Sequence, residues 1–424
     1  MKIAGCVRIC TLALVLSFAS VSTYGGDRFS IGGYYKNYFV AFDRAVPQSP
    51  LQNGTNPLLG AVTNRLRLTG RFDLTQRVAI ETAYNISPHI KDRVFFATSL
   101  LATGSANRAY RVTDFDAMLY PSRADDVATF AIFHNLDRAL ISISTDPADI
   151  FVGRQAIAWG SSRVVNPSDV VAPFRFEQLD VEDRIGVDAI RIRAPLGDLG
   201  ELDIGWIAGE DFDLDNSAAF VRTKVYHWES DISLIAVEFR RHLMLGFDVA
   251  RSVGGAGIWA EGAYVFADAF RQVTLINNRD YYRLSVGADY SLSASVYGLV
   301  EYHFNSIGEN DIQTVRPSGS GAAYLDGAVY LIGKHYLMPG LSWQVTPLVS
   351  VFGQTVWNVT DPSAYFTISG EYNIGEDIYL GSGASVGLGS GPDMVVSRPG
   401  FTPRLRSEFG SWPDFYYTSF RYYF

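Results

Sequence analysis

Segments of about ten residues with alternating polar and apolar side chains recur along the chain, and they strongly limit how it can fold. In residues 65–72, three arginines fall on one face and Leu66, Leu68 and Phe72 on the other. Residues 78–86 and 281–290 repeat this alternation. A period of two residues is typical of β-strands. The polar face carries charges on many strands, which suits the interior of a transmembrane β-barrel better than the apolar core of a soluble β-sandwich.

Clusters of Gly, Pro, Asp, Asn and Ser allow the strands to be counted. Short turns are expected at residues 73–76, 146–149, 196–200, 229–231, 254–257, 291–294, 344–347 and 373–377. Other connections are expected near residues 45–60, 88–136, 160–185, 211–216, 240–242, 267–279, 305–321, 359–363 and 388–412. We therefore predict an all-β, transmembrane antiparallel β-barrel of about 18 strands (range roughly 16–20), with short periplasmic turns and long extracellular loops.

The N-terminus has the three parts of a secretory signal. Lys2 and Arg8 are basic, residues 9–19 are apolar, and residues 20–23 are small. The apolar run is shorter than the roughly 20 residues of a spanning helix, so a retained anchor is the weaker alternative. We predict a signal peptide over residues 1–25 and one outer-membrane barrel domain over residues 26–424.

Composition excludes several classes of function. The net charge of −9 argues against nucleic-acid binding, and a hydrophobic fraction of 48% argues against a disordered chain. Both cysteines, Cys6 and Cys10, lie in the signal segment, and the six histidines are scattered without metal-site spacing. The glycine-rich stretches lack the Lys-Ser/Thr ending of a phosphate loop. We therefore expect no enzyme activity, no catalytic residues, no cofactor and no metal.

The alternation predicts which charged side chains face the barrel interior. A mostly basic group falls on the early strands and a mostly acidic group on the later ones, and such a field would sort solutes by charge. Ordinary cross-strand ion pairing is the alternative interpretation. The candidate pore-lining residues are Arg65, Arg67, Arg71, Arg154, Arg191, Arg193, Arg222, Lys224, Asp289, Glu301 and Glu371. We expect the arginines to favour anions.

Two long connections stand out. Residues 88–136 are expected to narrow the barrel or form a lid, with one short helix over residues 125–135. Residues 160–185 contain an acidic stretch in which Asp180, Glu182 and Asp183 are possible cation ligands. Their spacing matches no calcium loop, so a solvated acidic loop is the preferred interpretation.

The final strand ends on an aromatic residue. In residues 414–424, Phe420, Tyr422 and Phe424 share one face, and Ser419 and Arg421 the other. This resembles the C-terminal strand of Gram-negative outer-membrane proteins, which the barrel-assembly machinery recognises. The resemblance implies that the strand ending at Phe424 is such an assembly signal and that the protein resides in the outer membrane, in contact with its lipid.

A second resemblance covers about residues 134–210. Residues 152–160 (VGRQAIAWG), followed by Asn166-Pro167-Ser168-Asp169 and Gly186-Val187-Asp188, are similar to segments of porin-like barrels, including export-type barrels and barrels that sheath multihaem cytochromes. The resemblance implies a barrel of the porin type, with Arg154 in the lumen and Trp159 at the outer interface.

The preferred function is an outer-membrane porin for passive diffusion of small hydrophilic or charged solutes. One alternative is a barrel that sheaths a lumen-bound or periplasmic partner such as a multihaem cytochrome. Another is a surface receptor or adhesin that acts through its loops. No Cys-x-x-Cys-His haem attachment is present, so an electron conduit would need a separate cytochrome.

Overall fold

The computed structural model describes residues 28–43, 58–92, 110–113, 117–122, 129–173, 178–270, 279–310, 322–325, 328–397 and 400–424. The signal segment and most of the connection after residue 92 lie outside these residues. Eighteen strands form the barrel: β1 (Phe29–Asp43), β2 (Leu58–Asp73), β3 (Val78–Lys91), β5 (Phe130–Ser144), β6 (Asp149–Gln155), β7 (Val187–Leu196), β8 (Gly200–Ile207), β9 (Ala218–His227), β10 (Ser230–Phe239), β11 (His242–Val253), β12 (Ala256–Phe266), β13 (Tyr281–Ser291), β14 (Val296–Asn305), β15 (His335–Thr346), β16 (Val349–Asn358), β17 (Ser363–Gly375), β18 (Ile378–Leu388) and β21 (Asp414–Tyr423).

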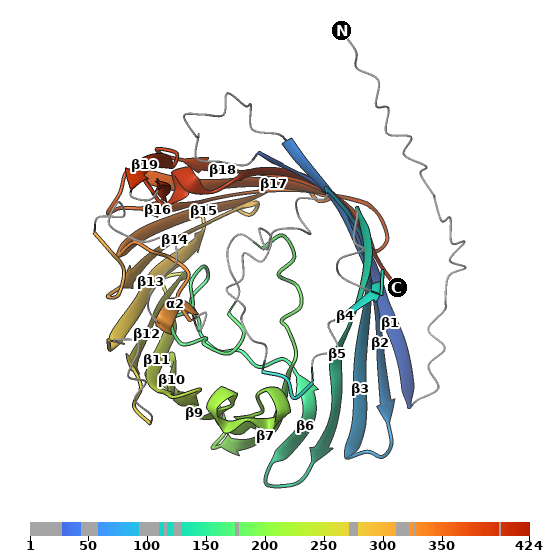
Figure 1. The fold of residues 1–424 in the computed structure, drawn as a ribbon. Helices are drawn as coiled ribbons and strands as arrows, with labels where there is room; N and C mark the ends of the chain where they lie inside the picture. The colour runs from blue at the N-terminus through green and yellow to red at the C-terminus, as the bar shows by residue number, and fades with distance from the viewer. Residues whose placement is uncertain are drawn as a thin grey trace.

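The sheet is closed and antiparallel throughout (Figure 1). Each strand pairs with the next along the barrel, and the last strand, β21, pairs with the first, β1. At this seam Lys36 lies opposite Arg65 on one side and Arg421 on the other. The predicted fold class, an antiparallel barrel of about 18 strands, is confirmed.

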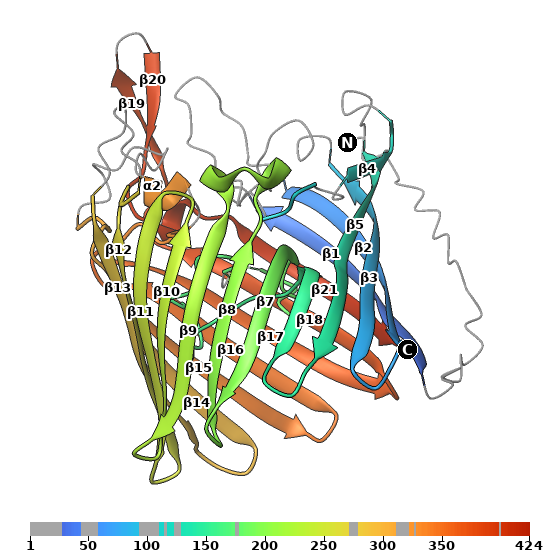
Figure 2. The ribbon, with the colours of Figure 1, turned by 90° about the horizontal axis from the view of Figure 1, so that it is seen from below.

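The two ends of the barrel differ (Figure 2). At one end all eight connections are short: residues 74–77, 145–148, 197–199, 228–229, 254–255, 292–295, 347–348 and 376–377. All eight overlap the predicted turns, because turn-forming residues lie within each connection or directly beside it, as Asp73 and Ser230 do. β1 begins and β21 ends at this same end of the barrel. The other end holds the longer connections, together with two short ones at residues 240–241 and 359–362.

The connection after β3 differs from the prediction. β3 continues to Lys91 and β5 starts at Phe130, so the two strands are longer and the connection shorter than residues 88–136. The predicted helix over residues 125–135 is wrong from residue 130 onward, because Phe130 pairs with Ile90 in the barrel ladder; residues 125–128 lie outside the described residues. The short strand β4 (Ala117–Tyr120) pairs with β5.

The two faces of the wall follow the alternation in the sequence. Ile190 and Ile192 on β7 are 48% and 42% exposed, while Arg191 between them pairs with Asp203. Many large apolar side chains are exposed in the same way, as expected for a surface that meets hydrocarbon. In the part of the chain that the structure describes, no helix is long and apolar enough to cross a membrane.

A few small elements lie outside the barrel wall. These are the hairpin of β19 (Asp393–Ser397) and β20 (Gly400–Arg404), the helix α2 (Ala322–Leu325), and the short 3-10 helices η3 (Glu210–Phe212), η4 (Leu214–Asn216) and η6 (Phe409–Ser411). The β19–β20 hairpin stands beyond the rim at the end with the longer connections (Figure 2).

Candidate functional site

The described parts of the connection between β6 and β7, residues 156–173 and 178–186, fold into the barrel, and we refer to them as the internal loop. Figure 1 shows its green trace inside the ring of strands. Residues 162–168 contact inward side chains of β12, β13 and β14, and residues 180–183 contact β1, β2 and β21 on another part of the wall. We predicted that the connection after β3 narrows the barrel. Most of that connection lies outside the described residues, so this prediction stays untested; its described residues 110–113 contact β5, β6 and the end of the internal loop. Among the described residues, the internal loop makes the crossing.

Glu261 on β12 anchors the start of the internal loop. The side chain is fully buried, and its carboxylate accepts hydrogen bonds from the backbone N–H groups of Ser162 (3.0 Å) and Ser168 (2.9 Å). The Ser168 hydroxyl (2.7 Å) and the Asn166 side-chain amide (3.2 Å) donate to the same carboxylate. A buried carboxylate needs such donors, so Glu261 and this segment stabilise each other.

Glu301 on β14, one of the predicted pore-lining residues, has a similar role. It is fully buried and accepts hydrogen bonds from the N–H groups of Arg163 (2.7 Å) and Val165 (2.9 Å) and from the Trp259 indole (2.9 Å). Its carboxylate is therefore taken up by the internal loop and does not face the open lumen.

β13 adds donors to the carbonyl groups of the same segment. Arg283 donates to the carbonyl of Pro167 (2.5 Å) and to that of Ala328, which belongs to the connection between β14 and β15. The Ser285 hydroxyl donates to the Val165 carbonyl (2.8 Å). The barrel wall thus binds five N–H groups and two C=O groups of residues 162–168.

The acidic half of the internal loop binds the seam of the barrel. Asp180 forms ion pairs with Lys36 (2.9 Å) and Arg65 (3.1 Å), and Glu182 forms one with Lys36 (2.5 Å). Asp183 accepts a hydrogen bond from the Tyr34 hydroxyl (2.6 Å). The preferred interpretation of a solvated acidic loop is therefore wrong, because these carboxylates meet the basic side chains of β1 and β2.

Lys36 is one of the site residues that the sequence did not predict. The residue is fully buried, and its ammonium group lies 4.1 Å from the centre of the Tyr34 ring. Lys36 lies opposite Arg65 in the register of β1 and β2, so the two side chains face the same side of the wall. Extending the alternation of β2 to β1 would have placed it among the inward basic residues.

A second buried cluster surrounds Asp137 on β5. Its carboxylate pairs with Arg67 (2.8 Å), Arg138 (2.6 Å) and Arg111 (3.5 Å), and accepts the N–H of Gly186 at the end of the internal loop (3.0 Å). Arg67, a predicted pore-lining residue, is only 4% exposed. The cluster therefore holds the end of the internal loop close to the wall. Because these charges are buried, removing one of them would leave its partner without compensation in the interior.

Arg154 on β6 lies inside the barrel, as the sequence resemblance implied, but it is buried. Its guanidinium pairs with Asp188 (2.8 Å) and donates to the carbonyls of Leu136 (2.9 Å) and Thr113 (2.8 Å). The implied placement of Trp159 is wrong. Its ring is 5% exposed and packs edge-on against Phe220, with the ring centres 4.7 Å apart. The chain leaves the wall after β6 and turns inward, which carries Trp159 away from the lipid-facing surface.

Strands β7 to β10 carry a ladder of paired charges. Arg191 pairs with Asp203 (2.6 Å), Arg222 lies 3.6 Å from Glu201, and Lys224 pairs with Asp231 (3.1 Å). Arg193 also pairs with Glu201. The other predicted residues are paired too: Arg71 with Glu81, Asp289 with Arg163 at 3.5 Å, and Glu371 with Arg421.

Ten of the eleven predicted pore-lining residues therefore have a partner of opposite charge, and the eleventh, Glu301, binds backbone N–H groups. The expected contrast between a basic and an acidic wall is thus largely neutralised locally. Among the predicted pore-lining residues, four basic side chains are at least 36% exposed: those of Arg65, Arg71, Arg193 and Lys224.

Two cavities border the lumen face. One, of about 300 Å³, is lined by Arg67, Arg71, Arg138, Glu81 and neighbouring small residues. The other, of about 200 Å³, lies between Leu179 of the internal loop and the wall of β16, β17, β18, β21 and β1. We refer to the latter as the serine cavity; it is lined by Tyr38, Leu179, Ser350, Phe352, Ser369, Gly370, Glu371, Gly381, Tyr417, Ser419 and Arg421.

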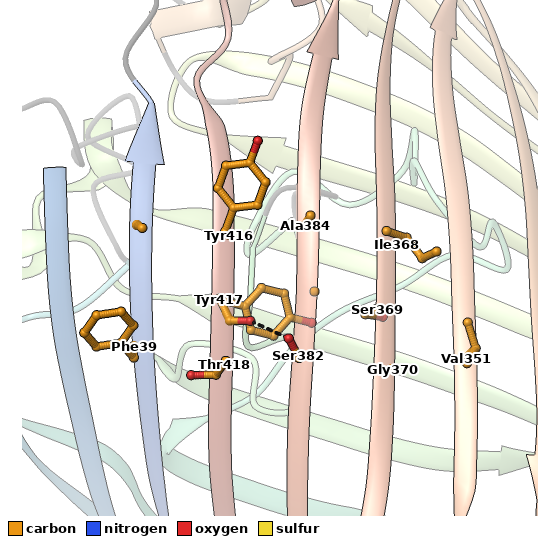
Figure 3. Close-up of a pocket in the computed structure, with 12 residues that line it drawn as sticks. Phe39, Val351, Ile368, Ser369, Gly370, Ser382, Ala384, Tyr416, Tyr417 and Thr418 are labelled. Atoms are coloured by element: carbon orange, nitrogen blue, oxygen red, sulfur yellow. Dashed lines mark hydrogen bonds between the residues drawn. The ribbon is translucent and has the colours of Figure 1, made fainter. Parts of the chain in front are cut away.

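The same strands form a groove of about 660 Å³ on the opposite face of the wall (Figure 3). Small residues such as Gly370 and Ala384 form its floor, and bulky ones such as Phe39 and Tyr416 rise beside it. Phe39 and Tyr416 are 51% and 46% exposed, and they belong to the outward set of β1 and β21. This groove faces away from the lumen and is not part of a solute path.

Glu408 is a further buried acid, in the connection between β18 and β21. It accepts hydrogen bonds from the Tyr336 hydroxyl (2.6 Å), the Asn358 amide (2.7 Å) and the Ile332 N–H (2.9 Å). Burial raises the pKa of Glu408 to about 7 despite these donors, and the nearby Asp361 acts in the same direction. Glu408 therefore joins two connections at the end of the barrel with the longer loops.

No metal site is evident in the described ranges, where no three His, Cys, Asp or Glu side chains are grouped to hold an ion. Asp180, Glu182 and Asp183 are already bound by Lys36, Arg65 and Tyr34. The possibility of a cation site in this stretch therefore has no support from its geometry.

Comparison with known proteins finds the same architecture in solved structures. OccAB2 of Acinetobacter baumannii matches with a TM-score of 0.55 and 9% identity over 94% of this chain and 98% of that one. The outer membrane proteins opdK and OprD of Pseudomonas aeruginosa match with TM-scores of 0.53, at 8% identity (94% and 99% of the two chains) and 10% identity (95% of each). No protein-family model and no curated protein matches the sequence. At these identities the likeness concerns the fold.

Proposed function

We propose that this protein is an outer-membrane porin through which small hydrophilic or charged solutes diffuse passively. The observation that carries the proposal is the internal loop, which is bound to opposite parts of a closed barrel and leaves cavities beside it. A barrel of this strand number is wide enough for an aqueous path. A loop fixed across it limits the size of what passes.

The structural neighbours support the location and the class. OprD and opdK are outer membrane proteins of Pseudomonas aeruginosa by their descriptions, and opdK has also been solved with vanillate. The exposed apolar side chains of this chain suit the lipid of such a membrane. A channel rather than an enzyme is the function that fits this arrangement.

Four basic residues are the candidates for charge selection. Arg65, Arg71, Arg193 and Lys224 retain exposed side chains in the lumen. Arg67, Arg154 and Glu301 are buried and support the internal loop and its surroundings. A weak preference for anions is expected, because the exposed cations act on passing ions while their paired carboxylates reduce the field.

The test is planar-bilayer conductance of the refolded protein under a salt gradient. Stable open channels are expected, with a reversal potential on the anion-selective side. Reversing Arg65, Arg71 and Arg193 to Glu should move that potential toward cation selectivity. Arg404→Glu, on the β20 strand outside the barrel wall, is the matched control and should leave it unchanged. A folded protein that never conducts contradicts the proposal.

We also propose how the protein is exported and assembled. Residues 1–25 act as a signal peptide, and the strand that ends at Phe424 is read by the barrel-assembly machinery. N-terminal sequencing of the membrane-inserted protein should begin near residue 26. Phe424→Ser should lower the amount of assembled, heat-modifiable barrel without changing synthesis.

The internal loop argues against a sheath for a partner such as a cytochrome, because it binds both parts of the lumen wall that a partner would contact. A surface receptor is favoured by one observation only, the β19–β20 hairpin that stands beyond the rim. Purification without a haem-containing partner would be consistent with the porin.

A further inference from the structure

The wall of β15 to β18 differs in charge from the rest of the barrel. Between Lys334 and Asp393 the sequence contains no lysine or arginine, and Glu371 is the one acidic residue within these four strands. By contrast, the wall of β1 and β2 carries Lys36, Arg65 and Arg67, which the internal loop covers with its carboxylates. We refer to β15–β18 as the uncharged wall; it adjoins the covered basic wall through β21.

The inward positions of the uncharged wall are rich in hydroxyl and amide groups. The ladder between β15 and β18 places polar side chains on one face in successive register positions. These are Ser342, Gln344, Ser350, Gln354, Thr367 and Ser369. Such groups both donate and accept hydrogen bonds without attracting either sign of ion.

The serine cavity lies where this wall meets the seam. Tyr38, Ser350 and Ser419 line the cavity, and their hydroxyls have no hydrogen-bond partner among the described residues. The rings of Phe352 and Tyr417 form part of the same lining. Free hydroxyls beside aromatic rings offer both hydrogen bonds and apolar faces to a small solute.

The charged members of the cavity cancel each other. Glu371 and Arg421 form an ion pair across the β17–β18–β21 wall, and both side chains remain partly exposed, at 39% and 22%. A closed ion pair presents carboxylate oxygens and guanidinium N–H groups in fixed positions, but no net charge. A hydroxyl group can therefore accept from one member and donate to the other, whereas a simple anion gains little.

We propose that the serine cavity is a subsite for neutral polyhydroxylated solutes of about the size of one hexose, and that the solute path follows the uncharged wall. The solute's hydroxyls bind the free serine and tyrosine hydroxyls and the Glu371–Arg421 pair, and its C–H faces contact the aromatic rings. This inference deepens the proposed function and rests on it, since it requires an open pore. It departs from the expectation that the arginines select the solute.

The experiment compares liposome swelling with glucose and with potassium gluconate, a six-carbon anion of similar size. The wild-type barrel should admit glucose at least about threefold faster than gluconate, because the path offers hydrogen bonds rather than unpaired charge. Ser350→Phe, which fills the cavity, should lower the glucose rate by about fivefold, since hydrogen-bonding groups and space are both lost. Val351→Phe on the outward face of the same strand is the matched control and should leave the rate unchanged.

Folding is checked by the heat-dependent gel shift, and Tyr38→Leu provides a second variant that removes a ring and a hydroxyl without adding bulk. It should also lower the glucose rate. Faster entry of gluconate than glucose through a conducting wild-type barrel, or unchanged glucose entry in both folded variants, overturns the subsite and leaves the porin intact. A folded wild-type barrel with neither conductance nor swelling overturns the porin itself and the subsite with it.

Discussion

Glu261 on β12 and Glu301 on β14 are separated by one strand, β13, and each carboxylate binds backbone N–H groups of the same seven-residue segment, 162–168. Both side chains are fully buried. Two acids of this kind on a barrel wall would ordinarily repel each other and attract cations. Here both carboxylates accept hydrogen bonds from peptide N–H groups of the internal loop, and these bonds hold the loop in one position across the lumen.

Glu301→Ala should loosen the internal loop. The substitution leaves the N–H groups of Arg163 and Val165 and the Trp259 indole without their acceptor, at a cost of about 3 kcal/mol. Single-channel conductance should rise and become noisier, and trypsin should cleave after Arg163 more rapidly. Glu229→Ala, in an exposed turn where the side chain pairs with Arg251, should change neither. A conductance equal to that of wild type would contradict the anchoring role.

Lys36→Met should make the pore more selective for cations. The change removes the buried partner of Glu182 and one of the two partners of Asp180, and breaking a buried pair costs about 3–5 kcal/mol. The freed carboxylates then face the lumen, so the reversal potential under a salt gradient should shift toward that of the cation. Lys36→Arg keeps the charge and should restore most of the wild-type value. An unshifted potential in a folded Lys36→Met protein would exclude this arrangement.

The contact between the two loops at Glu408 should weaken as the pH rises. Because burial raises the pKa of Glu408 from 4.5 to about 7, the protonated form is favoured in the folded state. Its stabilisation is complete below pH 4.5 and is lost as the pH increases through about 7. Tyr336, Tyr324 and Asp361 are the titratable groups around it, and none of them supplies a positive charge.

Hydrogen exchange of residues 328–334 measures this effect. Exchange should be slower at pH 5.5 than at pH 8.5 after correction for the intrinsic rate, and the difference should disappear in Glu408→Gln, which is neutral at both values. The same pH dependence in wild type and variant would show that another group controls the contact.

Trp159→Ala should destabilise the barrel by about 3–5 kcal/mol, because a buried ring packed on Phe220 is replaced by a cavity. Trp343→Ala is the control: that ring is 47% exposed on the outward face of β15 and loses far less buried area. Urea unfolding followed by the gel shift of the heat-modifiable band compares the two. Equal midpoints would place Trp159 in an exposed environment after all.

The barrel itself could be predicted because strand alternation and turn residues are local signals. The position of Arg191 between Ile190 and Ile192 is enough to assign it to the polar face of its strand. The two glycines at residues 254–255 are enough to predict the turn there. The path of the internal loop has no such signal. The alternation around Glu301 would be the same if its carboxylate faced water. It does not reveal that the carboxylate binds three N–H groups of residues 136 to 138 positions earlier in the sequence.

The charge pattern was misleading for the same reason. Alternation correctly identifies Arg65 and Arg191 as members of an inward-facing set, but it does not show that Asp180 comes from a loop to meet one and that Asp203 meets the other across the ladder. Trp159 was misplaced because its strand ends four residues earlier, at Gln155, and the periodicity no longer applies beyond that point.

Glu182 accepts hydrogen bonds from Lys36 on the first strand and from the Tyr423 hydroxyl on the last. The internal loop thus fastens together the two strands whose pairing closes the cylinder. If β1 and β21 separate to open the barrel laterally, the Glu182 contacts to Lys36 and Tyr423 must break, as well as the backbone hydrogen bonds between the two strands. The element that narrows the lumen also resists unzipping of the wall, so mechanical stability and permeability are controlled by the same few carboxylates.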